Sequence, residues 1–184
     1  MENNTNLSHA VRSGAIVGLI SIVFSMAVYI INVTLFSQFF IILGVSLTIS
    51  IGFGVFYGNQ HHKQLGGYKP FGQAFLHAFI LFYIAGILGT VFNYVLFVII
   101  DPDAAKTIQE ASLERIMSMM ERFGASEADI DKAMAEAREK MEDEGNSFSL
   151  GNQAINLLTR SIPYAIGALI VGAITQKKDP NLEL

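Results

Sequence analysis

The sequence predicts an all-α integral membrane protein with four transmembrane helices. An extracytoplasmic amphipathic helical hairpin is expected between helices three and four. Apolar residues make up 52% of the 184 residues and charged residues only 15%, whereas soluble domains carry about 25% charged residues. The charges are also unevenly spread, because residues 101–150 hold 19 of the 28. This pattern is typical of membrane helices that carry one water-exposed insert.

The charge-free run from Ser13 to His62 is long enough for two crossings. One crossing needs about 20 apolar residues, and this run has 50. Polar residues between Asn32 and Gln38 mark the break, so we expect helices at residues 11–32 and 36–58. The first apolar stretch exceeds the core of a cleavable signal peptide, and no small-residue cleavage site follows it. We therefore expect this helix to be retained.

The third and fourth helices are expected at residues 71–100 and 152–176. Pro70 suits the start of the third helix, because the amide that proline lacks has no helical partner there. At about 1.5 Å per residue this helix is longer than the bilayer core and should tilt or project. Arg160 and Pro163 interrupt the fourth helix.

The insert at residues 101–150 carries a net charge of −7 and is predicted to form two helices. Asp101 begins the first helix and Gly124 ends it, while Ser126 and Asp129 resemble a capping box for the second. Each helix has an apolar stripe at three- and four-residue spacing. We expect the stripes to bury against each other or the bilayer surface; the alternative is a methionine-rich surface for a partner. The stripes comprise Ile108, Ile116, Met119, Met120 and Phe123 in the first helix, and Ile130, Ala133, Met134, Ala137 and Met141 in the second.

These elements divide the chain into three parts. Residues 1–100 hold the N-terminal tail and three membrane helices, 101–150 the acidic insert, and 151–184 the fourth helix and a cytoplasmic tail. Basic residues near helix ends mark the cytoplasmic side, which favours a multi-pass protein of the cell inner membrane with both termini in the cytoplasm. The basic residues on that side are Arg12, Lys63, Lys69, Lys177 and Lys178.

Arg160, Asn93 and Thr159 form a candidate intramembrane polar cluster. An arginine inside a membrane helix is costly and often functional, and Asn93 is expected at a matching depth. Pro163 has no N–H to donate to the Thr159 carbonyl. We expect Arg160 to face the bundle and donate to Asn93 or to carbonyls near this break; the alternative is that it snorkels to the outer headgroups.

Composition argues against several classes of function. Cysteine is absent, which excludes disulfides and thiolate chemistry. The net charge of −4 argues against nucleic acid as a partner.

Four histidines fall on the predicted inner side, where we expect solvated rings rather than a metal site, and we expect no cofactor. These histidines are His9, His61, His62 and His77.

Pairs of glycines recur in the predicted membrane helices. Small residues about one helical turn apart let neighbouring helices approach closely. We expect these glycines to build the internal bundle rather than a dimer interface. The pairs are Gly14 and Gly18, Gly54 and Gly58, Gly86 and Gly89, and Gly167 and Gly172.

Two motifs give the chain a family resemblance. GGYKPFGQAF opens the third helix and GAITQKKDP ends the last one, with an acidic helical insert between them. In this order the chain resembles a bacterial membrane family catalogued as domain of unknown function 4199, over roughly residues 8–180. The resemblance implies four crossings and an inner-membrane location, and it implies no activity or catalytic residues.

No acid–base pair, nucleophile or phosphate-loop motif occurs in the sequence, so we do not expect an enzyme. We expect a non-enzymatic membrane interaction module, and the alternative is a small oligomeric transporter or channel. Its expected partners are the lipid bilayer and a protein or second copy bound through the insert or the glycine-rich helix faces.

Overall fold

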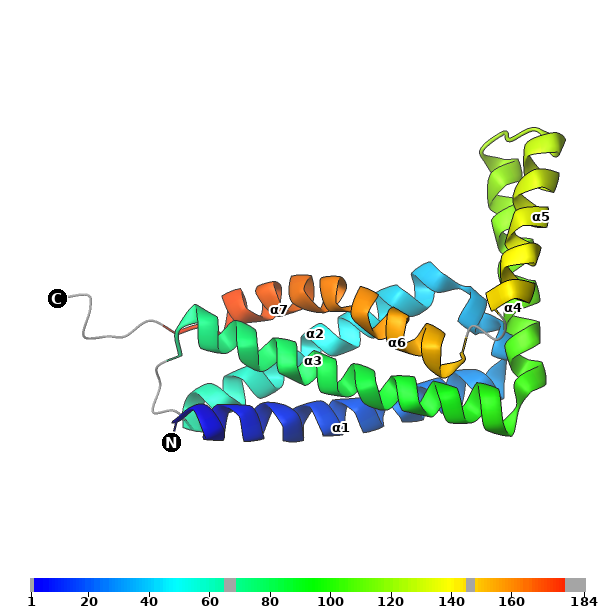
Figure 1. Ribbon diagram of the computed structural model, residues 1–184. Coiled ribbons are helices and arrows are strands. Elements are labelled where there is room, and N and C mark those ends of the chain that lie inside the picture. Colours follow the sequence, from blue (N-terminus) through cyan, green and yellow to red (C-terminus); the bar gives the residue numbers. More distant parts are fainter. Residues whose placement is uncertain (1, 65–68, 145–147, 178–184) are drawn as a thin grey trace.

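The computed structural model describes residues 2–64, 69–144 and 148–177, and there it is helical apart from turns and one isolated β-bridge. Five helices form an elongated bundle and two more stand across one end of it (Figure 1). The bundle helices are α1 (Glu2–Ile31), α2 (Phe39–Gln64), α3 (Phe71–Tyr94), α6 (Leu150–Thr159) and α7 (Ser161–Thr175). The crossing pair is α4 (Pro102–Arg122) and α5 (Glu127–Glu144).

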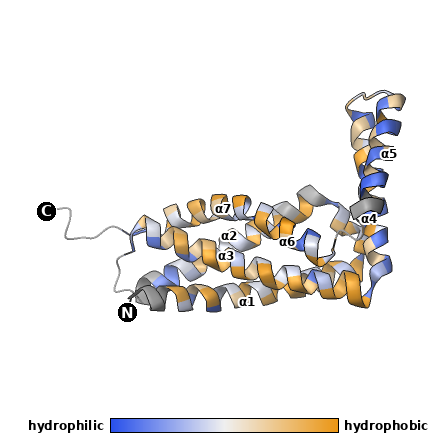
Figure 2. Ribbon diagram, in the orientation of Figure 1, coloured by the Kyte–Doolittle hydropathy of each residue, from blue (hydrophilic) through white to orange (hydrophobic). Residues whose placement is uncertain are grey.

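Helix α3 lies at the centre of the bundle, where it packs against α1, α2, α6 and α7. The buried core includes Val17 from α1, Leu81 and Phe82 from α3, and Val171 from α7. Apolar residues also cover the outside of the bundle, whereas hydrophilic ones gather on α4 and α5 (Figure 2). An apolar exterior is stable in lipid and unfavourable in water, as expected for membrane helices.

Three helical segments are long and apolar enough to cross a membrane: Leu7–Ile31, Phe71–Ile100 and Leu150–Thr175. The chain therefore has the properties of a multi-pass membrane protein. The expected second crossing, α2, is not among these segments. Several side chains at its apolar start lie outside the described residues, and its other end is the polar run from Asn59 to Gln64.

The other helix predictions are largely confirmed. Helix α3 begins at Phe71 after Pro70 and continues as a π-helix, η2 (Val95–Ile100), to the expected end. The last crossing is broken at Arg160, where α6 ends and α7 begins. Helix α1 begins well before the predicted residue 11, because a helix can continue with polar residues beyond an apolar segment. Helix α2 is displaced from 36–58 because the 3₁₀ helix η1 (Val33–Ser37) occupies the turn.

The insert forms the predicted helical hairpin with the predicted ends. The Asp101 carboxylate caps α4 by accepting from the Ala104 N–H at 3.0 Å. Gly124 ends this helix with a φ of 77°, which a residue with a Cβ rarely adopts. Ser126 accepts from the Asp129 N–H at 3.3 Å at the start of α5. Helix α5 packs against α4 and against no other described element.

The base of the hairpin is fixed to the bundle. Ala104, Ala105 and Ile108 of α4 are buried against η2. The Tyr29 hydroxyl donates to the Asp101 carboxylate at 2.7 Å. Together with the Ala104 N–H, this hydrogen bond holds the pKa of Asp101 below its ordinary value of 3.8.

Only part of the predicted apolar stripe of α4 is buried. Ile108 is buried at the base, but Ile116 and Met119 are exposed and Phe123 is 85% exposed. Leu113, outside the predicted stripe, is instead buried on α4. The error arises because the apolar residues of α4 cover two adjoining faces, and spacing alone does not show which of them meets α5.

The glycines act mainly within the bundle. A Cβ on Gly14 would lie 2.7 Å from the Leu81 carbonyl oxygen, and one on Gly58 would lie 2.7 Å from the Thr175 side chain. The other predicted pairs also have close neighbours in this chain, except Gly89, which has none within 4 Å. The prediction of internal packing is therefore confirmed for all of these glycines but Gly89.

Candidate functional site

Three histidines and one lysine meet at the end of the bundle where α1 begins. His9 comes from α1, His61 from α2 and His77 from α3, while Lys69 lies just before α3. We call these four residues the basic cluster. His61 and Lys69 are 0% exposed and His77 is 1% exposed, whereas His9 is partly exposed.

The three imidazole rings pack directly on one another. Nδ1 of His9 and Nε2 of His77 are 2.9 Å apart, so one of these rings donates to the other. The His61 and His77 rings are stacked, with centroids 4.7 Å apart and planes at 10°. The His9 centroid lies 4.7 Å from that of His61 and 5.1 Å from that of His77.

Backbone pairing holds Lys69 in place. Its N–H donates to the Lys177 carbonyl at 3.1 Å, and the Lys177 N–H donates back to the Lys69 carbonyl at 2.8 Å. Pro70 favours an extended backbone at Lys69, which suits this bridge. The bridge joins the two motifs that carry the family resemblance, GGYKPFGQAF and GAITQKKDP.

The basic cluster leaves polar atoms without hydrogen-bond partners. Among the described residues, neither ring nitrogen of His61 has a hydrogen-bond partner, and neither does Nδ1 of His77. The Lys69 ammonium has one long contact, 3.5 Å from the Gly58 carbonyl oxygen. A buried polar atom without a partner lowers the free energy of unfolding by roughly 1–3 kcal/mol, and a charged one lowers it by more. The ligand-free cluster therefore destabilises the fold.

Burial lowers the pKa of the Lys69 ammonium to about 8. Desolvation disfavours the charged form of a base, yet this value still leaves most of the group protonated at neutral pH. The cluster therefore combines one buried positive charge with two free imidazole N–H groups, one on His61 and one on whichever of His9 and His77 accepts the hydrogen bond between them.

The described residues contain no group of three or more histidine, cysteine, aspartate or glutamate side chains placed to hold a metal ion. Stacked rings do not direct their nitrogen lone pairs at one point, as a metal site requires. Lys69 would also repel a cation. The arrangement matches the chemistry of an anion better than that of a metal.

The expectation that the histidines are solvated is wrong for His61 and His77. His77 lies three and four residues from the core positions Ala74 and Leu81, and this helical spacing could have revealed its burial. The side chain of His62 lies outside the described residues. The burial of Lys69 has no comparable sequence signal, because it depends on the distant pairing with Lys177.

The candidate cluster of Arg160, Asn93 and Thr159 does not form the predicted hydrogen bond. Oδ1 of Asn93 is buried without a hydrogen-bond partner in the described part of the chain, and the Thr159 hydroxyl donates to the Ile155 carbonyl at 3.0 Å. Arg160 is exposed and interacts with the hydroxyl of Tyr164, one turn further on. Any functional role of the three residues stays a prediction.

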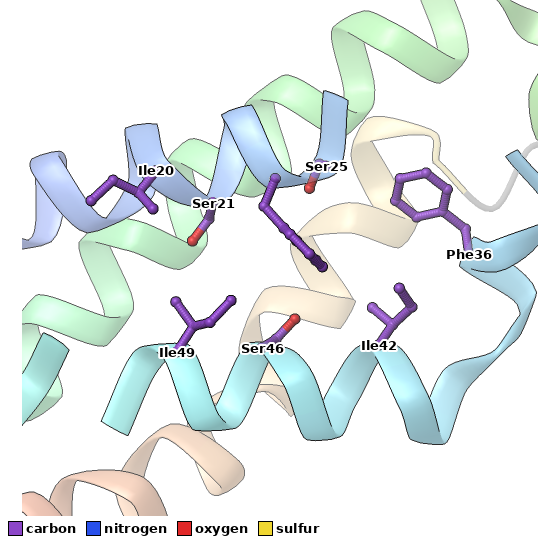
Figure 3. A pocket seen from close by; sticks show the side chains of 8 residues that line it. Ile20, Ser21, Ser25, Phe36, Ile42, Ser46 and Ile49 are labelled. Carbon is purple, nitrogen blue, oxygen red and sulfur yellow. The ribbon is translucent and has the colours of Figure 1, made fainter. Parts of the chain in front are cut away.

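A small cleft lies between α1 and α2 in the part of the bundle nearer the hairpin. Apolar side chains form most of its wall, and the hydroxyls of Ser21, Ser25 and Ser46 lie among them (Figure 3). Ser21 donates to the Val17 carbonyl at 2.9 Å, so its hydroxyl is already partnered. The apolar residues of the wall are Ile20, Phe24, Phe36, Ile42 and Ile49.

A long helical bundle, three segments able to cross a membrane and a terminal helical hairpin define a multi-pass α-helical membrane protein. Residues 12–177 match the family model described as protein of unknown function DUF4199. The chain belongs to this family, as its two motifs predicted. No curated protein and no solved structure matches the chain.

Proposed function

We propose that this chain is a four-crossing protein of the bacterial inner membrane with both termini in the cytoplasm. Helix α2 would supply the fourth crossing. It leaves η1 at the hairpin end of the bundle, and at the opposite end its His61 stacks on His77 and lies against the tilted ring of His9. A helix that joins the two ends of a membrane-spanning bundle has to cross the same thickness as its neighbours.

We further propose that the chain is a non-enzymatic interaction module whose working part is the α4–α5 hairpin. One observation carries this proposal: the hairpin stands across the end of the bundle and extends beyond its side (Figure 1). If the bundle axis follows the membrane normal, the hairpin lies along the outer membrane surface. Its overhanging part, the end of the hairpin that holds the turn between α4 and α5 (Figure 1), is then next to outer-leaflet lipid.

The face of α4 that meets the bundle continues into the overhanging part. Arg115 donates to the Ser37 hydroxyl of η1 at 2.8 Å, so this face points toward the bundle. Met119 and Arg122 follow four and seven residues later and share that face, and Phe123 adjoins it. All three are exposed. Apolar and basic side chains together suit the boundary between lipid headgroups and acyl chains.

The acidic residues favour the same orientation. Exposed acids crowd α5, which packs on α4 alone. Carboxylates are more stable in water than against lipid, so α5 would face away from the bilayer. The proposed partner of the α4 overhang is therefore the lipid of the outer leaflet. The exposed acids of α5 include Glu127, Asp129, Asp131, Glu136 and Glu139.

Tryptophan fluorescence can test this placement, because the chain has no tryptophan of its own. We expect Trp in a Phe123→Trp variant, reconstituted in nanodiscs, to be quenched by phospholipids brominated on the acyl chains. An Ala135→Trp variant on exposed α5 is the matched control and should not be quenched. Equal quenching of the two variants, or none at position 123, would refute the lipid-facing overhang.

An oligomeric transporter or channel is the second candidate. The cleft with serine hydroxyls between α1 and α2 favours it, because a neighbouring subunit could complete such a cleft into a path. Its test is the oligomeric state in lipid. A strictly monomeric chain would rule out a pore shared between subunits.

A further inference from the structure

The basic cluster is a second candidate site, at the opposite end of the bundle from the hairpin. Three helices and one connecting segment supply its titratable side chains. They are His9 from α1, His61 from α2, His77 from α3 and Lys69 from the segment before α3. Arg12 and Lys177 lie nearby and are exposed. No carboxylate of the described residues pairs with Lys69.

The unsatisfied atoms indicate which ligand would stabilise the cluster. A neutral imidazole offers one N–H and the lysine ammonium offers three, and here most of these donors have no acceptor. A neutral ligand could accept some hydrogen bonds but would leave the charge unpaired. An anion with several oxygens would accept from both kinds of group and pair with the ammonium.

The location of the cluster narrows the choice of anion. His9 lies near the start of the span Leu7–Ile31, and Lys69 lies two residues before the span Phe71–Ile100. Spans begin where the hydrocarbon meets the headgroups, so the cluster lies at the depth of phospholipid phosphates. The partly exposed His9 provides the side from which a ligand could approach.

We propose that His9, His61, Lys69 and His77 form a phosphate-binding site, in which the Lys69 ammonium pairs with the anion and the imidazoles donate to its oxygens. The phosphate belongs either to a phospholipid headgroup or to the free ion. This site is independent of the hairpin proposal, because the two lie at opposite ends of the molecule.

The test uses the full chain, purified in a glycosidic detergent without phosphate. Thermal unfolding is followed as sodium phosphate is added, with sodium chloride at equal ionic strength as the reference. A parallel titration adds phosphatidylglycerol or a neutral glycolipid that lacks phosphate. We expect phosphate or phosphatidylglycerol to raise the Tm and the two reference additives to leave it unchanged.

Lys69→Met should raise the half-saturating concentration of the effective additive about tenfold or more. Lys177→Met is the matched control, because Lys177 shares the backbone bridge but has an exposed side chain; it should bind as the wild type does. His61→Phe keeps a ring stacked on His77 and removes both nitrogens. It should also weaken binding, and it provides the test if Lys69→Met does not fold.

The additive that acts identifies the source of the phosphate. A response to the free ion supports a soluble ligand, and a response to phosphatidylglycerol alone supports a lipid. An equal response to chloride or glycolipid would overturn the proposal. So would equal stabilisation of the wild type, Lys69→Met and His61→Phe by phosphate and by phosphatidylglycerol.

Discussion

Lys69 combines a buried side chain with a backbone that has little freedom. The following proline and the two hydrogen bonds with Lys177 fix its main chain. The side chain then has to enter the bundle, where a single carbonyl contact at 3.5 Å replaces its hydration. Such a residue destabilises the ligand-free fold whenever it is charged, and this cost can be measured.

The pH dependence of stability should report this cost. The pKa of Lys69 is about 8 in the folded chain, against an ordinary value of 10.5. Between these values the unfolded chain binds more protons, so the free energy of unfolding should increase as the pH rises from about 8 to 10.5. Thermal unfolding in phosphate-free detergent buffer should show this increase in wild type and in Lys177→Met.

The Lys69→Met variant should lose this part of the pH dependence. It should also be at least as stable as the wild type near pH 7 without ligand, since it removes a buried charge. The same pH slope in Lys69→Met and wild type would contradict the buried position of the ammonium.

Arg160 and Asn93 should behave independently. Because Oδ1 of Asn93 is buried without a partner, Asn93→Leu should leave stability unchanged or increase it. A double-mutant cycle with Arg160→Leu should give a coupling energy within about 0.5 kcal/mol of zero. Thermal or chemical unfolding in detergent provides the measurement, and a clearly larger coupling would restore the polar cluster predicted from the sequence.

At the scale of the elements, the hairpin depends on a narrow apolar contact. Beyond the base of the hairpin, Leu113 of α4 and Ile130 of α5 are buried apolar residues, whereas Ile116 is exposed. Helix α5 has no other described element to pack against. Stability of the outer part of the hairpin should therefore depend on a few side chains and be lower than that of the bundle.

Substitution of Leu113 should loosen the hairpin selectively. We expect Leu113→Ala to destabilise the hairpin by about 2 kcal/mol or more, because it leaves a cavity, and Ile116→Ala to change it by less than about 0.5 kcal/mol. Hydrogen exchange of the α5 amides should accelerate in the first variant only. Equal effects of the two variants would mean that the α4–α5 contact lies on another face.

Elements with local signals were predictable from the sequence. Pro70, Asp101, Gly124 and Ser126 define helix ends through chemistry that acts within a few residues, and these ends are confirmed. The apolar stripe of α4 was predicted incorrectly. Helix α4 has two apolar faces, and only the tertiary structure shows which of them packs against α5. The basic cluster was missed for the same reason, since it joins residues that are up to 68 positions apart.

At the scale of the whole molecule, both ends of the described chain lie together. The start of α1 and the end of α7 share the end of the bundle that holds the basic cluster (Figure 1). In a bundle that spans the membrane, this arrangement corresponds to an even number of crossings, in agreement with the proposal that α2 is the fourth. The predicted orientation, with this end in the cytoplasm, follows from the basic residues and is open to a direct test.

Single cysteines can establish the orientation, because the chain has none of its own. We expect Ser126→Cys to react with a membrane-impermeant thiol reagent in intact cells, and Ser8→Cys and Lys177→Cys to react only after the membrane is opened. All three positions are exposed. The reverse pattern would invert the protein, and opposite behaviour at positions 8 and 177 would contradict an even number of crossings.

The bridge between Lys69 and Lys177 also limits how the bundle can move. It joins the residues just before α3 and just after α7 by two backbone hydrogen bonds. A slide of one helix along the other by a single turn, about 5.4 Å, would break both bonds. A pivot about this end would keep both bonds and would separate α6 from α3 at the opposite end of the bundle. The bridge therefore favours pivoting over sliding between α3 and α7.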